Sequence, residues 1–310
     1  MILTLLAIRQ LKKILDHRWD GNPNLPYYDP KDLSLEEESF SFMDDGYRID
    51  GSRYYVKGIK PKALVCFFHG IGAGRNAYLK EISLLCKEGY LVYAYDNLGC
   101  SYSEGKGIGC LGRPYETQMK FFKWLDNDEK AKGLKRYAVG HSWGGYGAMT
   151  ALNPEYKVEK SVSLAGFLKP STIIIKRAKK PLRKLGSLPI KIANRILGGK
   201  HGNIDARDVV RKSDGKLLYI VGDKDPLVPI SFNGETLNKE FGGSPRFKYM
   251  VVPGSSHQVH YTHEAEKYIL DLTNEGLGTI NSPVGLHMDI KKATEMNKDV
   301  FKAIFDFLED

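Results

Sequence analysis

Hydrophobic residues in this chain occur in short runs that are apolar along most of their length, separated by segments with helical periodicity. Such runs are typical of strands buried on both faces of a sheet. The predicted strands are 63–68, 90–95, 137–139, 161–167, 217–221 and 247–252. The predicted helices are 79–87, 115–124, 146–152 and 298–308. Strands alternating with helices predict an α/β fold, with a mostly parallel central sheet covered by helices on both faces.

Two kinds of segment precede the first buried run. Residues 39–43 and 47–56 have the pattern of strands, and Asp44-Asp45-Gly46 between them is a β-hairpin signal. Residues 1–37 form a lead-in that starts with an amphipathic helix, whose apolar positions are Leu5, Ile8, Leu11 and Leu15. We expect this helix to pack on the domain; an interfacial helix lying on a membrane is the alternative.

The alternation of strands and helices stops at residues 168–215. This segment holds 13 Lys or Arg against 3 acidic residues, whereas the whole chain has a formal net charge of +9, so the remainder is near neutral. Leucine and isoleucine recur between the charges, which predicts a small helical cap with an apolar side and a strongly basic side. Residues 38–167 and 216–310 would then form the α/β core. A solvated basic face without a ligand is the other interpretation.

The composition is that of an ordinary soluble globular protein, with 42% hydrophobic and 27% charged residues. The four cysteines are too few for a disulfide scaffold. Cys66 and Cys86 fall at apolar strand and helix positions, which is typical of a reducing compartment, so we expect a cytoplasmic protein. Cys100 and Cys110 flank one glycine-rich loop, which leaves a disulfide between them open.

The clearest chemical signal lies at residues 136–150. The apolar run 137–139 leads into Gly140-His141-Ser142-Trp143-Gly144-Gly145, and a small-residue helix follows. A strand that passes through a glycine-bracketed serine into a helix is a nucleophile elbow. The turn holds the Ser142 hydroxyl clear of the sheet edge and places a helix N-terminus behind it.

A serine nucleophile needs a base, and the base needs an orienting acid. His257 lies in a turn-rich segment after the strand 247–252, at the carboxyl edge of the sheet where ligands gather. The strand 217–221 leads into Gly222-Asp223-Lys224-Asp225-Pro226, and Pro226 fixes the turn directly after Asp225. We therefore predict Ser142, Asp225 and His257 as nucleophile, acid and base, with Asp223 capping local backbone.

From about residue 38 onward the chain resembles the α/β-hydrolases. It is most similar to the branch with monoacylglycerol lipases, lysophospholipases and related cap-bearing serine esterases and peptidases. The motifs that carry the resemblance are HGIG at 69–72, D-x-x-G-x-x-x-S at 96–103, GHSWGG at 140–145, GDKDPLVP at 222–229 and PGSSH at 253–257. The resemblance implies the same three catalytic residues, with the backbone N–H groups of Ile71 and Trp143 as the oxyanion hole. It implies neither a cofactor nor a metal.

Two features depart from the family pattern. Leu98 stands where the family loop often has an arginine, and Ser101 where it has a second glycine. Residues 261–297 intervene before the last helix, so we expect an insertion that reshapes the rim of the pocket.

We therefore expect a serine hydrolase that cleaves carboxylic esters, such as acyl glycerols, lysophospholipids or small acyl and aryl esters, through an acyl-enzyme. A basic cap suits an anionic substrate or an anionic membrane. We expect any contact with the membrane to be peripheral and to be made by the cap or by the N-terminal helix. We expect no nucleic-acid partner. A thioesterase, an aminopeptidase and a non-catalytic ligand-binding relative are the alternatives. A metal site is a further one, because His257, His260 and His263 recur every three residues beside Glu264, although not as H-E-x-x-H.

Overall fold

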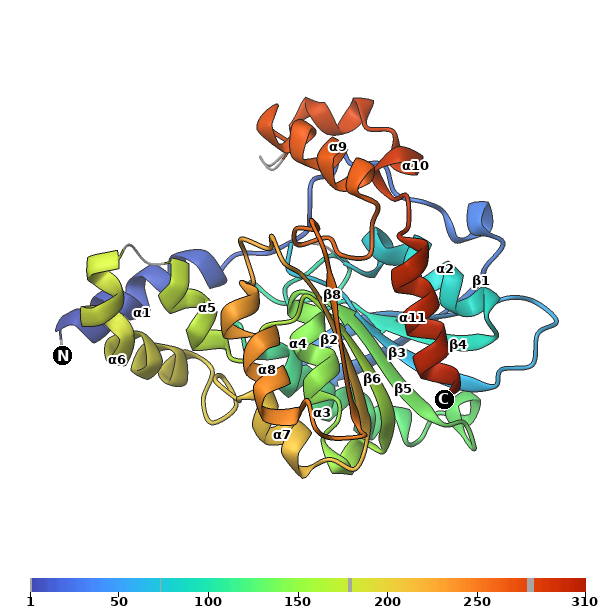
Figure 1. The fold of residues 1–310 in the computed structure, drawn as a ribbon, viewed down its shortest axis with the longest axis horizontal. Helices are drawn as coiled ribbons and strands as arrows, with labels where there is room; N and C mark the ends of the chain where they lie inside the picture. The colour runs from blue at the N-terminus through green and yellow to red at the C-terminus, as the bar shows by residue number, and fades with distance from the viewer. Residues whose placement is uncertain (1, 73, 178–179, 278–281) are drawn as a thin grey trace.

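The computed structural model describes residues 2–72, 74–177, 180–277 and 282–310. At its centre the described residues form an eight-stranded sheet with the order β1-β2-β4-β3-β5-β6-β7-β8 (Figure 1). The strands are β1 (Glu36–Asp44), β2 (Tyr47–Tyr55), β3 (Ala63–Phe68), β4 (Tyr90–Tyr95), β5 (Arg136–His141), β6 (Val158–Leu164), β7 (Lys216–Gly222) and β8 (Phe247–Val252). The β1–β2 and β2–β4 pairs are antiparallel and the other pairs are parallel, which confirms the predicted mostly parallel sheet.

One strand ends earlier than the sequence predicts. The strand expected at 161–167 stops at Leu164. Ala165 follows with a φ of 48°, which an extended strand cannot contain. Gly166 then approaches the helix after the elbow, where an added Cβ would lie 2.5 Å from the carbonyl carbon of Gly145. The chain leaves the sheet here because it must pass close to the elbow.

Helices cover both faces of the sheet, as predicted. The helices on one face are α3 (Arg113–Leu125), α4 (Trp143–Thr150), α7 (Ala206–Lys212) and α8 (Gly234–Phe241). On the other face lie α2 (Leu79–Lys87) and α11 (Lys298–Glu309) (Figure 1). Alternate residues of β5 serve the two cores: Ala138 packs under α4, whereas Tyr137 and Val139 face the core under α2 and α11. Because alternate side chains of β5 are buried on opposite faces of the sheet, the orientation of the residues at the end of this strand is fixed.

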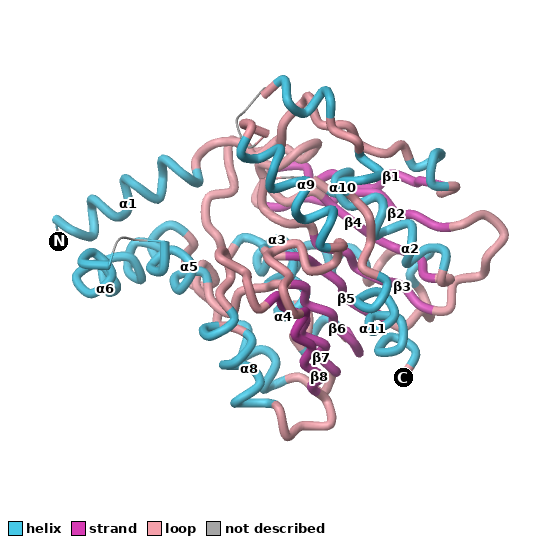
Figure 2. The backbone as a smooth tube through the Cα atoms, turned by 45° about the horizontal axis from the view of Figure 1, so that its top comes forward, coloured by secondary structure: helices cyan, strands magenta, loops and turns pink. Residues whose placement is uncertain are grey.

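A pair of helices far apart in sequence extends from one side of the molecule. Helix α1 (Ile2–Leu15) packs along α6 (Lys180–Leu197), and α5 (Pro170–Arg177) connects α6 to the sheet (Figures 1 and 2). We call α1 and α6 together the α1–α6 arm. The C-terminal half of α1 is buried through Leu11 and Leu15, while its N-terminal half is exposed. Leu182 and Leu185, predicted for the apolar side of the cap, lie outside the described side chains.

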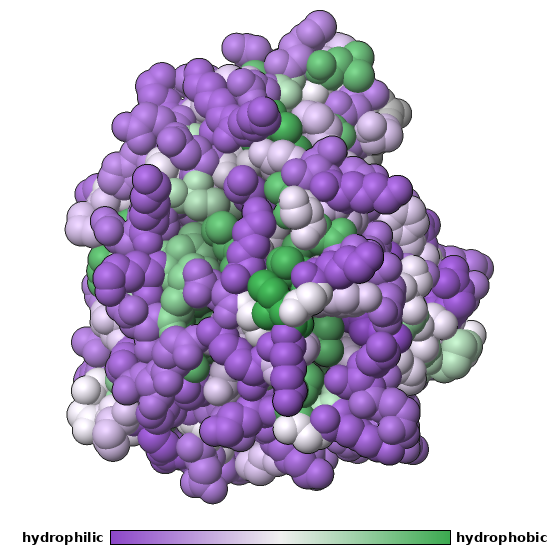
Figure 3. Space-filling view, turned by 90° about the vertical axis from the view of Figure 1, so that its right-hand side faces the viewer, coloured by the Kyte–Doolittle hydropathy of each residue, from purple (hydrophilic) through white to green (hydrophobic). Residues whose placement is uncertain are grey.

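The segment 261–297 carries α9 (His263–Asn274) and the short α10 (Ile290–Ala293), which lie together at another end of the molecule before the chain enters α11 (Figure 1). The face on the side of α2 and α11 is mostly hydrophilic, with hydrophobic side chains gathered in hollows near its centre (Figure 3). All four cysteines are buried free thiols. No helix in the described parts of the chain is long and apolar enough to cross a bilayer.

Candidate active site

Ser142 occupies the turn between β5 and α4 in a strained backbone conformation. Its φ is 58° and its ψ is −113°, a combination that residues with a Cβ seldom adopt. Both bracketing glycines are required by close backbone approaches. A Cβ on Gly140 would lie 2.1 Å from the Gly144 carbonyl oxygen, and one on Gly144 would lie 1.9 Å from the carbonyl oxygen of Phe68. The sheet and helix therefore hold Ser142 in this turn from both sides.

The structure brings Ser142, His257 and Asp225 into one hydrogen-bonded chain. His257 Nε2 is 2.8 Å from Ser142 Oγ, and its Nδ1 is 2.7 Å from Asp225 Oδ2. An ionised carboxylate only accepts, so Nδ1 carries the proton and Nε2 is left to accept from the serine hydroxyl. The imidazole is therefore in the tautomer that can remove the hydroxyl proton.

Asp225 is held ionised although it is buried. Burial opposes its ionisation, but the hydrogen bond and charge of His257 outweigh it, together with the N–H groups of Val228 and Leu227, which donate to Oδ1. The net effect is a pKa below the ordinary value for aspartate. Asp223 has a different partner: its Oδ1 accepts from the Gly254 N–H at 2.7 Å. The acid beside the imidazole is thus Asp225, and Asp223 fixes a neighbouring turn.

The two predicted oxyanion donors border the same pocket as Ser142. Trp143 is the first residue of α4, so its N–H has no acceptor one turn earlier in the helix. Ile71 follows Gly70 in the turn after β3. Both residues line the pocket together with Ser142 and His257. The Trp143 indole is fixed away from this amide by donating to the Leu111 carbonyl at 2.8 Å.

The pocket above Ser142 has a volume of about 370 Å³. Its apolar wall comes from Leu111, Phe167, Ile173, Leu227 and Val228. Among its described lining residues there is no Asp, Glu, Lys or Arg. The site therefore offers an uncharged, mostly apolar surface beside the serine hydroxyl.

The three closely spaced histidines do not converge on one point. His257 contacts Ser142 and Asp225, whereas His260 is buried beside Glu81. His263 begins α9 and lies next to Gly254. Within the described residues, no three His, Cys, Asp or Glu side chains are grouped so that they could hold a metal ion.

A family model described as serine aminopeptidase, S33, matches residues 59–214, which is half of the chain. The chain belongs to this family of α/β-hydrolases. It is similar to a monoacylglycerol lipase of Mycolicibacterium smegmatis, with 26% identity over 251 residues that cover 68% of this chain and 86% of the lipase.

Two solved structures share the fold of this S33-family chain. The Pyrococcus furiosus esterase Pf2001 matches with a TM-score of 0.60 and 21% identity over 82% of this chain and 97% of the esterase. Est1E of Butyrivibrio proteoclasticus, solved with ferulic acid bound, matches with a TM-score of 0.56 and 19% identity over 77% of this chain and 96% of Est1E. The predicted α/β-hydrolase fold is confirmed.

The loop in which this S33 hydrolase departs from the family pattern is anchored by Asp96. Asp96 Oδ1 accepts from the Arg75 N–H at 2.7 Å, and its Oδ2 lies 2.5 Å from the Arg75 guanidinium. Ser103 donates to the Asp96 carbonyl oxygen at 2.6 Å. Ser101, in place of the second family glycine, takes the φ of 44° that glycine would adopt more easily. Asp96 and Ser103 of the motif thus hold the loop in place by hydrogen bonds.

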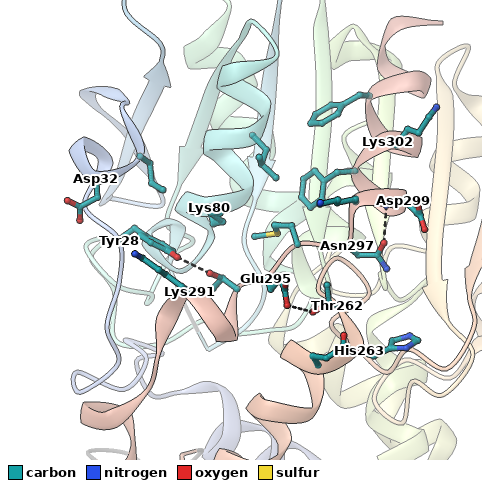
Figure 4. A pocket seen from close by; sticks show the side chains of 18 of the residues that line it. Tyr28, Asp32, Lys80, Thr262, His263, Lys291, Glu295, Asn297, Asp299 and Lys302 are labelled. Atoms are coloured by element: carbon teal, nitrogen blue, oxygen red, sulfur yellow. Dashed lines mark hydrogen bonds between the residues drawn. The ribbon is translucent and has the colours of Figure 1, made fainter.

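A second cavity of the S33 hydrolase, about 1080 Å³, lies away from Ser142. It is a groove between α2, α11 and the segment 261–297, bordered by lysines and carboxylates (Figure 4). Of the residues in 261–297 that the structure describes, only Tyr261 lines the pocket above Ser142. The segment therefore contributes far more to this second groove than to the rim we expected it to reshape.

A buried carboxyl group next to the site was not identified from the sequence. Glu81 of α2 is fully buried, and its Oε1 accepts from the Tyr261 hydroxyl at 3.0 Å. The same oxygen is 3.1 Å from His260 Nε2, but the two atoms are not aligned as a hydrogen bond. Burial raises the pKa of Glu81 to about 7 and lowers that of His260 to about 3. Both side chains are therefore held in their neutral forms at mildly acidic pH.

This raised pKa predicts a pH-dependent loss of stability. Unfolded, Glu81 ionises near pH 4.5; folded, it stays protonated up to about pH 7. The contribution of Glu81 to folding stability is complete below its unfolded-state pKa. It is lost as pH rises through its folded-state pKa. Glu81→Gln keeps a neutral side chain, so the free energy of unfolding of the mutant, measured relative to that of the wild type, should rise with pH by roughly 3 kcal/mol at most once pH exceeds 7. Denaturant unfolding of both proteins between pH 5 and pH 8 measures the difference.

His260 and His141 are present in both the wild type and Glu81→Gln. Their contributions to the pH dependence of stability therefore cancel when the two proteins are compared. Glu88→Gln is the matched control, because Glu88 is exposed at the end of the same helix. It should leave the pH dependence unchanged. A constant difference between wild type and Glu81→Gln across this range would contradict the prediction.

Proposed function

We propose that this S33-family chain is a serine hydrolase that cleaves carboxylic esters through an acyl-enzyme. Ser142 would be the nucleophile, His257 the general base and Asp225 the orienting acid. The observation that carries the proposal is the hydrogen-bonded chain from Ser142 Oγ through His257 to Asp225. It joins the three residues in the order, tautomer and spacing that acyl transfer requires.

In the first half-reaction, Ser142 Oγ bonds to the ester carbonyl carbon while its proton moves to His257 Nε2. The carbonyl oxygen becomes negative, and the N–H groups of Ile71 and Trp143 would stabilise it. The tetrahedral intermediate then breaks its bond to the alcohol oxygen, which receives the proton from Nε2. Water repeats these steps on the acyl-enzyme, releasing the acid and restoring the Ser142 hydroxyl. Asp225 stabilises the imidazolium throughout.

The pocket favours an uncharged acyl or aryl group over the N-terminus of a peptide. An aminopeptidase must bind the ammonium group of its substrate, and a carboxylate is the group that does this best. The described lining residues include none. The apolar wall instead suits the hydrocarbon of an acyl chain. Ester hydrolysis therefore fits this member of the family better than peptide hydrolysis.

The α1–α6 arm supports peripheral contact with an anionic membrane as the source of the ester. Seven of the 17 large hydrophobic side chains exposed in the described residues belong to it: Ile2, Leu3, Leu5, Leu6, Leu188, Ile192 and Ile196. Exposed basic residues accompany them on both helices: Arg9, Lys12, Lys13, Lys191 and Arg195. Apolar side chains with basic neighbours on helices are the pattern that binds an anionic lipid surface.

An ester panel tests the proposed function. It should contain p-nitrophenyl esters from acetyl to dodecanoyl, aminoacyl p-nitroanilides, and one long-chain monoacylglycerol presented in zwitterionic or anionic vesicles. We expect hydrolysis of the esters, a preference for acyl chains above acetyl, and no release from the anilides. Anilide turnover above ester turnover would assign the protein to the peptidases instead.

The vesicle samples test the membrane contact. Hydrolysis should be faster on anionic vesicles, and the difference should shrink with added salt, which screens exposed charges beyond about 8 Å at physiological ionic strength. Leu3→Ser with Leu6→Ser should weaken vesicle binding by at least about tenfold. Leu270→Ser is the control, because Leu270 is similarly exposed but lies on α9, outside the arm. Equal rates on both vesicle types would exclude the contact.

A further inference from the structure

A chain of buried hydrogen bonds connects the three loops that meet at Ser142. The Gly70 N–H donates to the Tyr78 hydroxyl at 3.1 Å. That hydroxyl is 2.9 Å from His141 Nδ1, and His141 Nε2 is 3.0 Å from the backbone carbonyl oxygen of His257. Gly70 precedes the oxyanion residue Ile71, and His141 precedes Ser142. The chain thus joins the oxyanion turn, the elbow and the segment that carries the base.

Chemistry fixes the direction of every hydrogen bond in this chain. A carbonyl oxygen can only accept, so His141 must carry its proton on Nε2. Burial, followed by the nearby His260 and His257, holds the pKa of His141 well below its ordinary value, so the ring has no second proton and Nδ1 accepts. The Tyr78 hydroxyl therefore donates to Nδ1 and is left to accept from Gly70. Burial also raises the pKa of Tyr78, which keeps its hydroxyl protonated.

Packing around these hydrogen bonds restricts the residue at position 70 and the charge at position 141. A Cβ added to Gly70 would lie 2.5 Å from the Tyr78 hydroxyl oxygen, so only glycine allows this approach. The His141 ring lies 5.0 Å, between centroids, from the ring of His257. A neutral His141 can stand this close to an imidazolium without the repulsion that a second positive charge would cause.

We propose that Tyr78 and His141 are positioning residues, which set the His257 imidazole and the Ile71 amide relative to Ser142. The inference rests on the proposed function of those three residues. A displacement of about 1 Å in such a site can cost 10²-fold in rate. The chain of hydrogen bonds constrains the backbone next to the oxyanion residue, at Gly70, and the backbone of the base, at His257. Neither residue exchanges a proton with the substrate; each acts through the backbone group to which it is bonded.

Tyr78→Phe tests this role because it removes one hydroxyl oxygen and leaves the ring. We expect kcat for a p-nitrophenyl ester to fall about ten- to a hundredfold, with KM changed less than about threefold. Tyr95→Phe is the matched control: the Tyr95 hydroxyl is also buried, and the structure gives it no hydrogen-bond partner among the described residues. Its kcat should equal that of the wild type.

A double-mutant cycle with His141→Gln separates positioning from general stability. If Tyr78 and His141 act as one chain, the double mutant should lose little more kcat than the more severe single mutant. Independent, additive losses would overturn the proposal, as would a kcat in Tyr78→Phe equal to that of the wild type. The proposal would also be overturned if a variant destabilised to the same extent by a substitution far from the site showed the same fall in kcat as Tyr78→Phe. Failure of the proposed function is distinguishable, because the wild type itself would then not hydrolyse the ester.

Discussion

Ser142→Ala is expected to lower the kcat for ester hydrolysis by about 10⁶-fold, as loss of the nucleophile does in the serine protease template. The remaining rate would come from substrate binding and the oxyanion donors alone. The mutant should also lose labelling by a fluorophosphonate probe, which bonds to the activated hydroxyl. Steady-state kinetics and probe labelling of the purified protein measure both effects.

Stability should change little in this mutant. Alanine retains the Cβ, so the backbone at φ 58° remains as strained as in the wild type. Ser171→Ala is a suitable control, because Ser171 is buried in α5 and its hydroxyl has no hydrogen-bond partner among the described residues. It should retain both activity and labelling. Full activity in Ser142→Ala would remove serine catalysis from consideration, and sensitivity to chelators would then point to the histidines.

Asp225→Asn is expected to lower kcat by about 10⁴-fold with a smaller change in KM. An amide in place of the carboxylate removes the charge that stabilises the His257 imidazolium, and its NH₂ group can hold the ring in the wrong tautomer. Asp223→Asn should cost far less, because an asparagine oxygen can still accept from the Gly254 N–H. Kinetics of both folded variants across pH measure the contrast. A larger loss in Asp223→Asn than in Asp225→Asn would transfer the acid's role to Asp223.

The sequence was most informative where local geometry restricts the residue type. The elbow glycines are recognisable because backbone atoms lie where a Cβ would be, and the buried strands because both faces of the sheet are covered. The early end of β6 was missed, because Gly166 is constrained by Gly145, a neighbour in space that the local pattern does not reveal.

The buried polar residues show more strongly that the sequence reveals local constraints but not those imposed by neighbours in space. Tyr78 and His141 look ordinary in the sequence, since their tasks arise only where three loops meet. Glu81 did leave a signal: it lies four residues before the buried Leu85, and so on the apolar face of α2. A carboxyl group on such a face predicts a buried partner, but the identity of Tyr261 and His260 depends on tertiary contact alone.

The packing of α1 against α6 has a consequence for the order in which the protein folds. Helix α1 is synthesised well before its partner α6, which is not complete until residue 197. At about 5–20 residues per second, the side of α1 that packs on α6 stays uncovered for roughly ten seconds or longer. During that interval it is a surface for chaperones or for aggregation, while the hairpin β1–β2 can form at once from adjacent residues. The contact between α1 and α6 thus forms late, although α1 itself is made early.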